Sequence, residues 1–458
     1  MHRTIIRNGF VLSMDAHLGD LPQADVLVED GVIAAVGPAL DVGDAEEIDA
    51  AGTIVIPGFV DAHRHAWQGA LRGILPDCSL DEYLAVVLGP LGGSFRPDDV
   101  HIGNLLSVYD AFHAGITTML DWSHINHTPE HADAAVDALR AGGIRAVYAH
   151  GTAGGPEWWA YSDRRHPDDV RRIRDRSFSA GDGLLSLALA VRATGHATPD
   201  AVKDDFGLAR ELGIPITLHA GFRVTGYPFT HVLDLRELGL LGPDVNYVHC
   251  TTMTDEELQL IADSGGSVTV TPLVEMNMAH GAPPIGRCFA RGLRPSLGVD
   301  VATSGPTEMF TQMRVAMAQS RSLECPQEID VPFAPSLGVR DVLELATIGG
   351  ARTLGLDDRI GSLVPGKDAD VVLIRADQIN TMPLTDPVAT VVAAADTSSV
   401  DTVLVRGRVV KREGRLVDFD RAKLLGEAER SRDFLLAVAG MTPDWLARRQ
   451  EASVPEPA

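Results

Sequence analysis

The chain has 458 residues, enough for more than one domain, and its 45% hydrophobic and 22% charged residues are ordinary for a globular protein. A formal net charge of −24 would repel phosphate backbones, which argues against a nucleic-acid polymer as partner. No apolar run reaches the ~20 residues of a membrane-spanning helix, and the N-terminus lacks the apolar stretch of a signal peptide, so we expect a cytoplasmic protein that does not bind membranes.

Both ends of the chain are rich in short β-type runs. Near the N-terminus, residues 26–28 and 32–36 flank a turn in which Gly31 can adopt a positive φ, which is typical of a hairpin. Near the other end, residues 370–374 and 403–410 have the same character. Because these β-rich ends bracket a long middle of another kind, we predict one small β-sandwich domain built from both termini.

The middle of the chain alternates short apolar runs with segments of helical spacing, such as 133–140 and 255–262. The apolar runs are 53–60, 116–120, 144–149, 184–191, 214–218, 245–248, 267–270 and 293–298. Continuous apolar strands that alternate with amphipathic helices are typical of a parallel sheet covered by helices, and eight of them fit a (β/α)8 barrel. The expected fold is therefore α/β, with three parts: a β-sandwich domain (1–55 and 360–418), a barrel (56–359), and a C-terminal helix and tail (419–458).

Polar residues stand where several of these apolar runs end. In a barrel, functional side chains collect at the carboxyl ends of the strands. The first run leads into His63 and His65, which share a face because strand side chains alternate. The fifth, sixth and eighth runs lead into His219, His249 and Asp300. One histidine at a strand end is more often structural, but the whole set indicates a metal site, and imidazole with carboxylate suits zinc, iron or manganese.

Several motifs resemble those of the amidohydrolase superfamily. Residues 57–65, PGFVDAHRH, followed by Leu71-Arg72-Gly73, resemble its metal-binding signature. Further similar segments are TLHA at 217–220, VHC at 248–250, LGVD at 297–300 and GSLVPGKDADVV at 361–372. The resemblance extends over nearly the whole chain. It is closest to the branch that holds cytosine, guanine and S-adenosylhomocysteine deaminases and the triazine hydrolases.

The resemblance implies a metal held by four ligands: His63, His65, His219 and Asp300. It also implies that His249 contacts the metal-activated water or the substrate. Asp300 would act as the catalytic base, taking a proton from that water. Members with two metals usually carry a Lys after the fourth strand, and residues 187–194 contain none. One divalent ion is therefore expected, with zinc as the first choice and iron or manganese as alternatives.

One position departs from the pattern of this branch. Its deaminases commonly place a Glu three residues after the strand-five histidine, where it passes protons to the ring nitrogen and the leaving amine. Here that position holds Phe222, and an apolar ring cannot transfer protons. Either the substrate needs no such protonation, or another group replaces the Glu. The candidates are Glu275, His124, His280 and Glu308.

Substrate contacts are expected from polar and aromatic residues beside the predicted strand ends, where a planar ligand can stack and form hydrogen bonds. These candidates are Trp67, Gln68, Trp122, His124, Arg192 and Glu275.

The predicted function is that of a metal-dependent hydrolase, which attacks a carbon–nitrogen bond with metal-activated water and deaminates an amino-substituted heterocycle. Hydrolysis of a cyclic or aryl amide is the alternative that Phe222 favours, and dechlorination of an aromatic heterocycle occurs in the same branch. A non-catalytic scaffold would usually have lost metal ligands, and none is missing here. A metal-dependent decarboxylase is a further alternative. The partners expected from the resemblance are a small-molecule substrate and further copies of the chain in a homo-oligomer.

Overall fold

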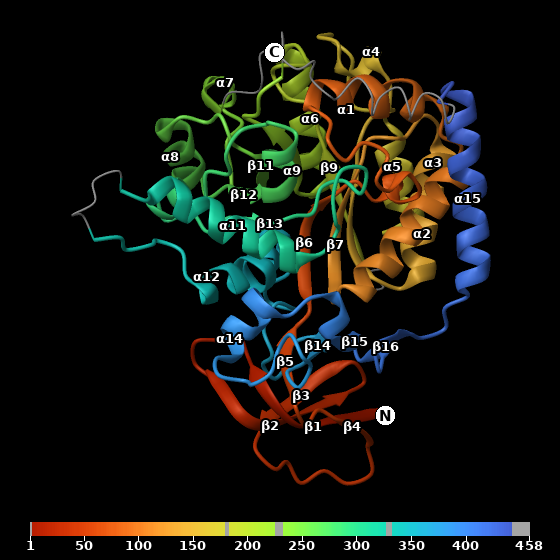
Figure 1. The fold of residues 1–458 in the computed structure, drawn as a ribbon. Coiled ribbons are helices and arrows are strands. Elements are labelled where there is room, and N and C mark those ends of the chain that lie inside the picture. Colours follow the sequence, from red (N-terminus) through yellow and green to blue (C-terminus); the bar gives the residue numbers. More distant parts are fainter. Residues whose placement is uncertain (1, 179–182, 225–231, 327–331, 442–458) are drawn as a thin grey trace, which may run out of the picture.

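The computed structural model describes residues 2–178, 183–224, 232–326 and 332–441. Two sheets organise them: a parallel barrel surrounded by helices, and a mixed sheet at one end of it that contains the N-terminus (Figure 1). This arrangement confirms the α/β barrel with a separate β unit. Among the described residues, no helix combines the length and the apolar character needed to cross a membrane.

Among the described residues, the barrel contains eight strands, each parallel to its neighbours in the order of the sequence. Its strands are β6 (Phe59–Arg64), β7 (Ile116–Ser123), β8 (Arg145–His150), β9 (Leu185–Ala190), β10 (Ile216–Ala220), β11 (Val245–His249), β12 (Ser267–Val270) and β13 (Ser296–Leu297). Nearly all of their residues are buried, because helices cover the outside and side chains fill the inside. Continuous apolar runs in the sequence follow from this burial on both faces.

The barrel closes between its last and first strands. The Asp300 backbone N–H donates to the His63 carbonyl at 3.0 Å, and the His65 N–H donates to the Asp300 carbonyl at 2.9 Å. Gly298 makes this approach possible, since a Cβ there would lie 2.7 Å from the His63 carbonyl oxygen. Backbone pairing alone therefore brings His63, His65 and Asp300 together at the carboxyl end of the barrel.

Helices follow the strands and lie outside the barrel (Figure 1). They are α1 (Leu80–Val86), α2 (Pro97–His113), α3 (Pro129–Gly142), α4 (Pro156–Trp159), α5 (Asp169–Ser177), α6 (Pro199–Leu212), α7 (Val232–Glu237), α8 (Asp255–Ser264), α9 (Pro272–Asn277), α10 (Ile285–Phe289), α11 (Met309–Glu324), α12 (Val339–Glu344), α13 (Gly350–Thr353), α14 (Pro387–Ala389) and α15 (Arg421–Val438).

Local sequence sets the ends of these helices. The Thr254 hydroxyl accepts from the backbone N–H of Glu257 while the Glu257 carboxylate accepts from Thr254, so the two residues form a capping box at the start of α8. Thr198 caps α6 in the same position. Both helices stop at a glycine in the left-handed region, Gly265 and Gly213.

In the part of the chain that the structure describes, the second sheet has nine strands and draws on residues near both termini. Its strands are β1 (Arg3–Leu12), β2 (Asp20–Glu29), β3 (Val32–Gly37), β4 (Glu46–Asp49), β5 (Thr53–Pro57), β14 (Val371–Arg375), β15 (Val400–Val405), β16 (Arg408–Arg412) and β17 (Arg415–Leu416). The sheet curls, because the Ala369 N–H donates to the Gly31 carbonyl at 2.8 Å and brings the β2–β3 turn against the start of β14. Residues from both termini, such as Val26 and Leu404, fill the enclosed core.

The first predicted barrel strand, 53–60, is wrong as a single element. Thr53–Pro57 forms β5 and pairs with β1 and β14 in the mixed sheet, whereas the barrel begins at Phe59. Gly58 separates the two strands: its N–H donates to the Asp370 carbonyl at 2.9 Å, and a Cβ there would overlap the Thr117 side chain at 2.0 Å. The run is apolar throughout, so hydropathy does not reveal the change of sheet.

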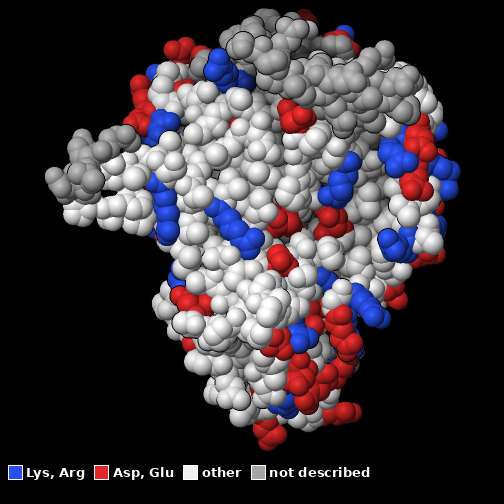
Figure 2. All heavy atoms as spheres, viewed as in Figure 1, with Lys and Arg blue, Asp and Glu red and all other residues white. Residues whose placement is uncertain are grey.

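Helix α15 runs along the outside of α2 (Figure 1). The Ser431 hydroxyl donates to the buried Asp99 carboxylate at 2.8 Å, and the Arg96 guanidinium lies 3.5 Å from the centroid of the Phe434 ring. On the face shown in Figure 2, charged side chains are sparse over the barrel and denser around the mixed sheet below it. The large negative charge therefore does not gather over the barrel on this face.

Candidate active site

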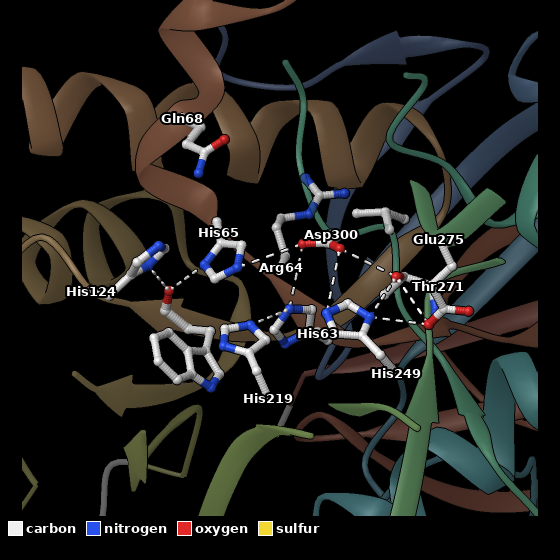
Figure 3. A network of polar contacts seen from close by, with 12 residues as sticks. His63, Arg64, His65, Gln68, His124, His219, His249, Thr271, Glu275 and Asp300 are labelled. Carbon is white, nitrogen blue, oxygen red and sulfur yellow. Dashed lines mark hydrogen bonds and ion pairs between the residues drawn. The ribbon is translucent and has the colours of Figure 1, made fainter. Parts of the chain in front are cut away.

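Four side chains from three places in the barrel converge at its carboxyl end. The Nε2 atoms of His63 and His219 lie 3.3 Å apart, and Asp300 Oδ1 lies 3.4 Å from His63 Nε2 (Figure 3). His65 Nε2 lies 3.5 Å from the same carboxylate oxygen. Ligands roughly 2.1 Å from one common ion have spacings of this size. The donor set of three imidazoles and one carboxylate therefore fits a divalent cation.

His63 belongs to both groups of close donor atoms in the site. One group joins it to His65 and Asp300, the other to His219 and His249, and within each group the donor atoms lie within 4.8 Å of one another. All of these residues except His219 are fully buried, so water does not compete freely for their lone pairs. His63 is thus the side chain shared by every arrangement of ligands that the described residues allow.

Hydrogen bonding fixes which nitrogen of His65 is available. Its Nδ1 lies 2.8 Å from the Trp122 carbonyl oxygen, which can only accept, so Nδ1 carries the proton and Nε2 keeps its lone pair. Burial lowers the pKa of His65 well below its usual value, and the neighbouring His124 and His63 lower that pKa further. His65 is therefore a neutral imidazole that offers Nε2 to a metal.

The charges of His219 and Asp300 also suit a metal site. Burial lowers the pKa of His219 well below its usual value, which keeps it neutral. Burial raises the pKa of Asp300, but a hydrogen bond from His63 and the nearby histidines outweigh this effect and lower that pKa overall. Asp300 is therefore an anionic donor beside the neutral imidazoles of His65 and His219.

His249 is held by a buried carboxylate. Its Nδ1 lies 3.0 Å from Glu275 Oε1, while its Nε2 faces Asp300 Oδ2 at 3.9 Å (Figure 3). Burial lowers the pKa of His249, yet the hydrogen bond that it donates to Glu275 and the charge of Asp300 outweigh burial and raise that pKa overall. The Thr271 hydroxyl links the two sides, since it donates to Asp300 Oδ2 at 3.2 Å and contacts His249 Nδ1 at 3.2 Å.

The backbone is strained at two of these residues. His249 has φ 78° and Asp300 has φ 65°, both in the left-handed region that side chains other than glycine seldom adopt. Such strain persists where surrounding contacts hold it, and it concentrates at functional sites. At these two strand ends the left-handed backbone directs the side chains of His249 and Asp300 toward each other.

A cavity of about 420 Å³ opens beside the converging side chains. His65, His219, His249 and Asp300 lie at its inner end. Apolar side chains make up much of its wall: Leu80, Leu84 and Leu88 lie on α1 and the turn that follows it, opposite Phe222, Val274 and Met278. A largely apolar cavity that ends in a few polar groups is the usual form of a small-molecule site.

The proposed substrate contacts occupy different places. Among the six, His124 is the one found in the described lining of the cavity, with its ring centroid 4.2 Å from that of His65. Trp122 packs against His219 at 4.3 Å between ring centroids, and Trp67 packs against Phe95 at 4.8 Å. Both tryptophans are fully buried and support the ring cluster from behind.

Three further proposed contacts lie behind the lining. Gln68 donates to the Tyr83 hydroxyl at 2.5 Å, and it is Tyr83 that lines the cavity. Glu275 lies beneath His249. Arg192 is buried and donates to the carbonyls of Trp158 at 3.1 Å and His196 at 3.3 Å. Direct substrate contact by these three residues and the two tryptophans stays a prediction.

Sequence reasoning missed two parts of the site. Thr271 follows β12 directly, so the strand-end rule that led to His219 and His249 also points to it. The leucines of α1 carry no such signal, because Leu at helical spacing indicates an ordinary buried face. Glu308, one candidate replacement for the missing Glu, caps α11 instead and accepts from the Thr311 N–H at 2.9 Å.

Arg64 stands between the two histidines of β6 and points away from the site. Its guanidinium pairs with buried Asp61 at 2.7 Å and donates to the carbonyls of Ser107 and Thr307. The other Asp61 oxygen accepts from the Val299 N–H at 3.0 Å, so the pair ties β6 to the strand that closes the barrel. Burial raises the pKa of Asp61, and the charge of Arg64 opposes that rise.

Removing one partner of this pair is expected to destabilise the fold. We predict that Arg64→Ala lowers the free energy of unfolding by about 3–5 kcal/mol, because Asp61 is left buried without its counter-charge. Denaturant titration followed by circular dichroism measures the change. The double variant Arg64→Met with Asp61→Leu removes both charges and is expected to lose less. A loss below about 1 kcal/mol in Arg64→Ala, the range of an exposed pair, contradicts this account.

Comparisons with known proteins agree with this geometry. The model of the "Amidohydrolase family" matches residues 54–410. A 5-methylthioadenosine/S-adenosylhomocysteine deaminase of Symbiobacterium thermophilum is 32% identical over 90% of this chain and 94% of its own length. A 5'-deoxyadenosine deaminase of Methanosarcina mazei is 29% identical over 94% of this chain and 98% of its own.

Solved structures are similar over nearly the whole chain. An adenosine deaminase from Xanthomonas campestris with bound zinc has a TM-score of 0.83 at 25% identity, over 95% of this chain and 98% of that one. An atrazine chlorohydrolase from Arthrobacter aurescens, complexed with zinc, has a TM-score of 0.80 at 22% identity, over 94% and 100%, and shows the shared fold. Because the family model spans far more than half of the sequence and includes all the converging side chains, this chain belongs to the amidohydrolase family.

Proposed function

We propose that this protein hydrolyses the exocyclic carbon–nitrogen bond of an adenosine derivative and releases ammonia. That it is a metal-dependent hydrolase of carbon–nitrogen bonds follows from its family and from the relatives named as deaminases. The observation that carries the finer proposal is the pair of donor groups that share His63, one with His65 and Asp300 and one with His219 and His249, at the inner end of a largely apolar cavity. Such a cavity buries a planar heterocycle and presents one of its carbons to the cluster.

The divalent ion has four proposed ligands: His63, His65, His219 and Asp300. When bound, such an ion supplies a water acidic enough to lose a proton near neutral pH. One ion, with zinc preferred, is proposed because the residues of β9 and its end, up to Thr194, include no lysine to bridge a second one.

The protein side chains manage the protons of the reaction. As water adds to the carbon that bears the amine, Asp300 takes a proton, and its Oδ2 stays in place through the hydrogen bond from Thr271. His249, held by Glu275, donates a hydrogen bond to the oxygen that adds to the ring. The carbon–oxygen bond forms and the carbon–nitrogen bond breaks. One proton of the water leaves with the amine as ammonia, and the other stays on the adjacent ring nitrogen.

The cavity favours an uncharged substrate. Its described lining contains no lysine or arginine, whereas Asp81 and Asp300 contribute acidic groups. A phosphate buried there would find no counter-charge among these residues, and uncompensated burial of a charge costs several kcal/mol. We therefore propose a nucleoside rather than a nucleotide.

A substrate panel tests this proposal. With the zinc-loaded enzyme, we expect ammonia release from adenosine, 5'-deoxyadenosine or 5'-methylthioadenosine, measured with a coupled ammonia assay. Adenosine 5'-monophosphate is expected to have a kcat/KM at least about 100-fold lower, since ~3 kcal/mol of uncompensated charge burial corresponds to that factor. Equal rates for nucleoside and nucleotide would contradict the proposed neutral site, and no ammonia from any amino-heterocycle would contradict deamination.

Hydrolysis of a cyclic or aryl amide is the second candidate. It is favoured by Phe222, which lines the cavity where deaminases of the resembling branch carry a proton-transferring Glu. Ring opening of cyclic amides in the same panel separates the two reactions. A homo-oligomer, a cytoplasmic location and the division into three domains stay predictions from the sequence.

A further inference from the structure

His280 occupies a fixed position in the cavity wall. It follows α9, is 3% exposed and lines the cavity. Its backbone N–H donates to the Glu275 carbonyl at 2.9 Å, and its carbonyl accepts from the Thr251 hydroxyl at 2.8 Å and from the Arg223 N–H at 3.2 Å. Segments after three neighbouring strands, β10, β11 and β12, thus hold one residue in place.

The ring nitrogens of His280 have no hydrogen-bond partners in the described part of the chain. Neither Nδ1 nor Nε2 has a hydrogen bond there, although both atoms are buried. Burial lowers the pKa of His280 to about 3, so the ring is neutral near pH 7 and offers one N–H donor and one free lone pair. Leaving two such atoms unsatisfied is costly unless a ligand completes them. The arrangement therefore indicates that the ring nitrogens of His280 form hydrogen bonds with the bound substrate.

His280 also lies beside the position at which the sequence departs from related deaminases. Its ring centroid is 5.9 Å from that of Phe222 and 5.1 Å from that of His249. The rings of Phe222 and His249 are themselves 5.4 Å apart, so the three rings surround one corner of the cavity. Phe222 fills the place of the expected Glu with an apolar ring, and His280 places two ring nitrogens without hydrogen bonds among the described residues in the same corner.

We propose that His280 is the catalytic residue that transfers the proton which Phe222 cannot. This step rests on the proposed hydrolysis of a carbon–nitrogen bond. As water adds to the ring carbon, one of its O–H bonds breaks, and Asp300 takes that proton and passes it to the lone pair of His280. His280 then gives the proton to the adjacent ring nitrogen and returns to its neutral form. The second proton of the water reaches the leaving amine through Asp300, so atoms and charges balance without a further reactant.

Three variants separate proton transfer from packing. His280→Phe keeps a ring but removes both nitrogen atoms, and we expect its kcat to fall at least about 100-fold, the usual scale of one acid–base group. His280→Gln keeps a donor and an acceptor but cannot carry a proton. Its KM should therefore stay within about threefold of that of the unmodified enzyme, while its kcat falls as much as in His280→Phe. Adding Phe222→Glu to His280→Phe should restore at least about tenfold of kcat, because a carboxylate returns to the same corner.

Controls exclude a general effect on the fold. His166→Gln changes another buried histidine, one that pairs with His150 outside the cavity lining, and should leave kcat within about threefold. Metal content and melting temperature of the His280 variants should match those of the unmodified protein. If His280 had only a structural role, its variants would lose metal and melt at a lower temperature, and Phe222→Glu would not restore kcat.

The assays use whichever substrate of the panel turns over best. If the unmodified enzyme opens cyclic amides and releases no ammonia, deamination is wrong, and His280 is tested on the amide, whose leaving nitrogen also needs a proton. If His280→Phe keeps kcat within about threefold on that substrate, or if Phe222→Glu fails to restore activity in the double variant, the proposal for His280 is overturned. The two failures are therefore distinguishable.

Discussion

His63→Ala is expected to weaken metal binding by roughly 100-fold or more and to remove turnover with it. Even residues that only orient a metal ligand contribute 10–100-fold to affinity, and His63 is itself a proposed ligand. Its Nε2 lies 3.3 Å from that of His219 and 3.4 Å from Asp300 Oδ1, so no other described side chain shares its place in both donor groups. Metal analysis after dialysis against limiting zinc measures the loss, and the ammonia assay measures turnover.

A matched control uses another strand-end histidine. His150 ends β8, is fully buried and contacts His166 rather than the donor cluster, at 2.9 Å between ring nitrogens. His150→Ala should therefore keep its metal even if its stability falls. Melting curves for both variants show whether each is folded. Stoichiometric metal of unchanged affinity in folded His63→Ala would contradict the proposed site.

The convergence of the proposed ligands was predictable because strand geometry alone determines it. In a parallel barrel, side chains of alternate parity point inward and the carboxyl ends share one edge. A histidine pair two residues apart and single residues after three further strands must therefore approach one another. The observed distances, 3.3 Å from His63 to His219 and 3.4–3.5 Å from Asp300 to His63 and His65, follow from that rule and from the closure of the barrel.

The limits of prediction from sequence lie where partners are distant in the chain. Strand β13 has two residues, Ser296–Leu297, within the predicted run 293–298, because the chain then leaves it to pair with β6 through Asp300. The run 53–60 divides at Gly58 because Thr117, on another strand, leaves no room for a side chain. Neither constraint is visible in local hydropathy.

Substrate contacts were harder to predict than ligands because loops lack a regular period. Trp67 and Trp122 follow or end barrel strands, yet their rings turn toward the core, where they pack on Phe95 and His219. Leu84 and Leu88, far from any strand end, come to face the cavity because α1 lies across the barrel mouth. Adjacency to a strand end places the backbone near the site but does not fix the direction of the side chain.

Asp300→Asn is expected to lower kcat at least about 1,000-fold while the metal stays bound. The amide has the same shape and can still offer an oxygen ligand, but it carries no charge and cannot take a proton from water. Asp300 Oδ1 faces His63 and His65, whereas Oδ2 accepts from Thr271 and faces His249. One oxygen is thus directed to the ligand cluster, and the other is directed to the part of the site where protons move.

The two roles of Asp300 can be measured separately. Thr271→Val removes the hydroxyl that positions Oδ2 but leaves the carboxylate, so it should reduce kcat by only about tenfold, the scale of one hydrogen bond. Turnover and metal content are measured on the same preparations of both variants. Loss of metal in Asp300→Asn would make Asp300 chiefly a ligand, whereas full turnover with metal bound would mean that another group accepts the proton. Retained metal with lost turnover, together with a mild effect of Thr271→Val, is the result that a catalytic base at this position requires.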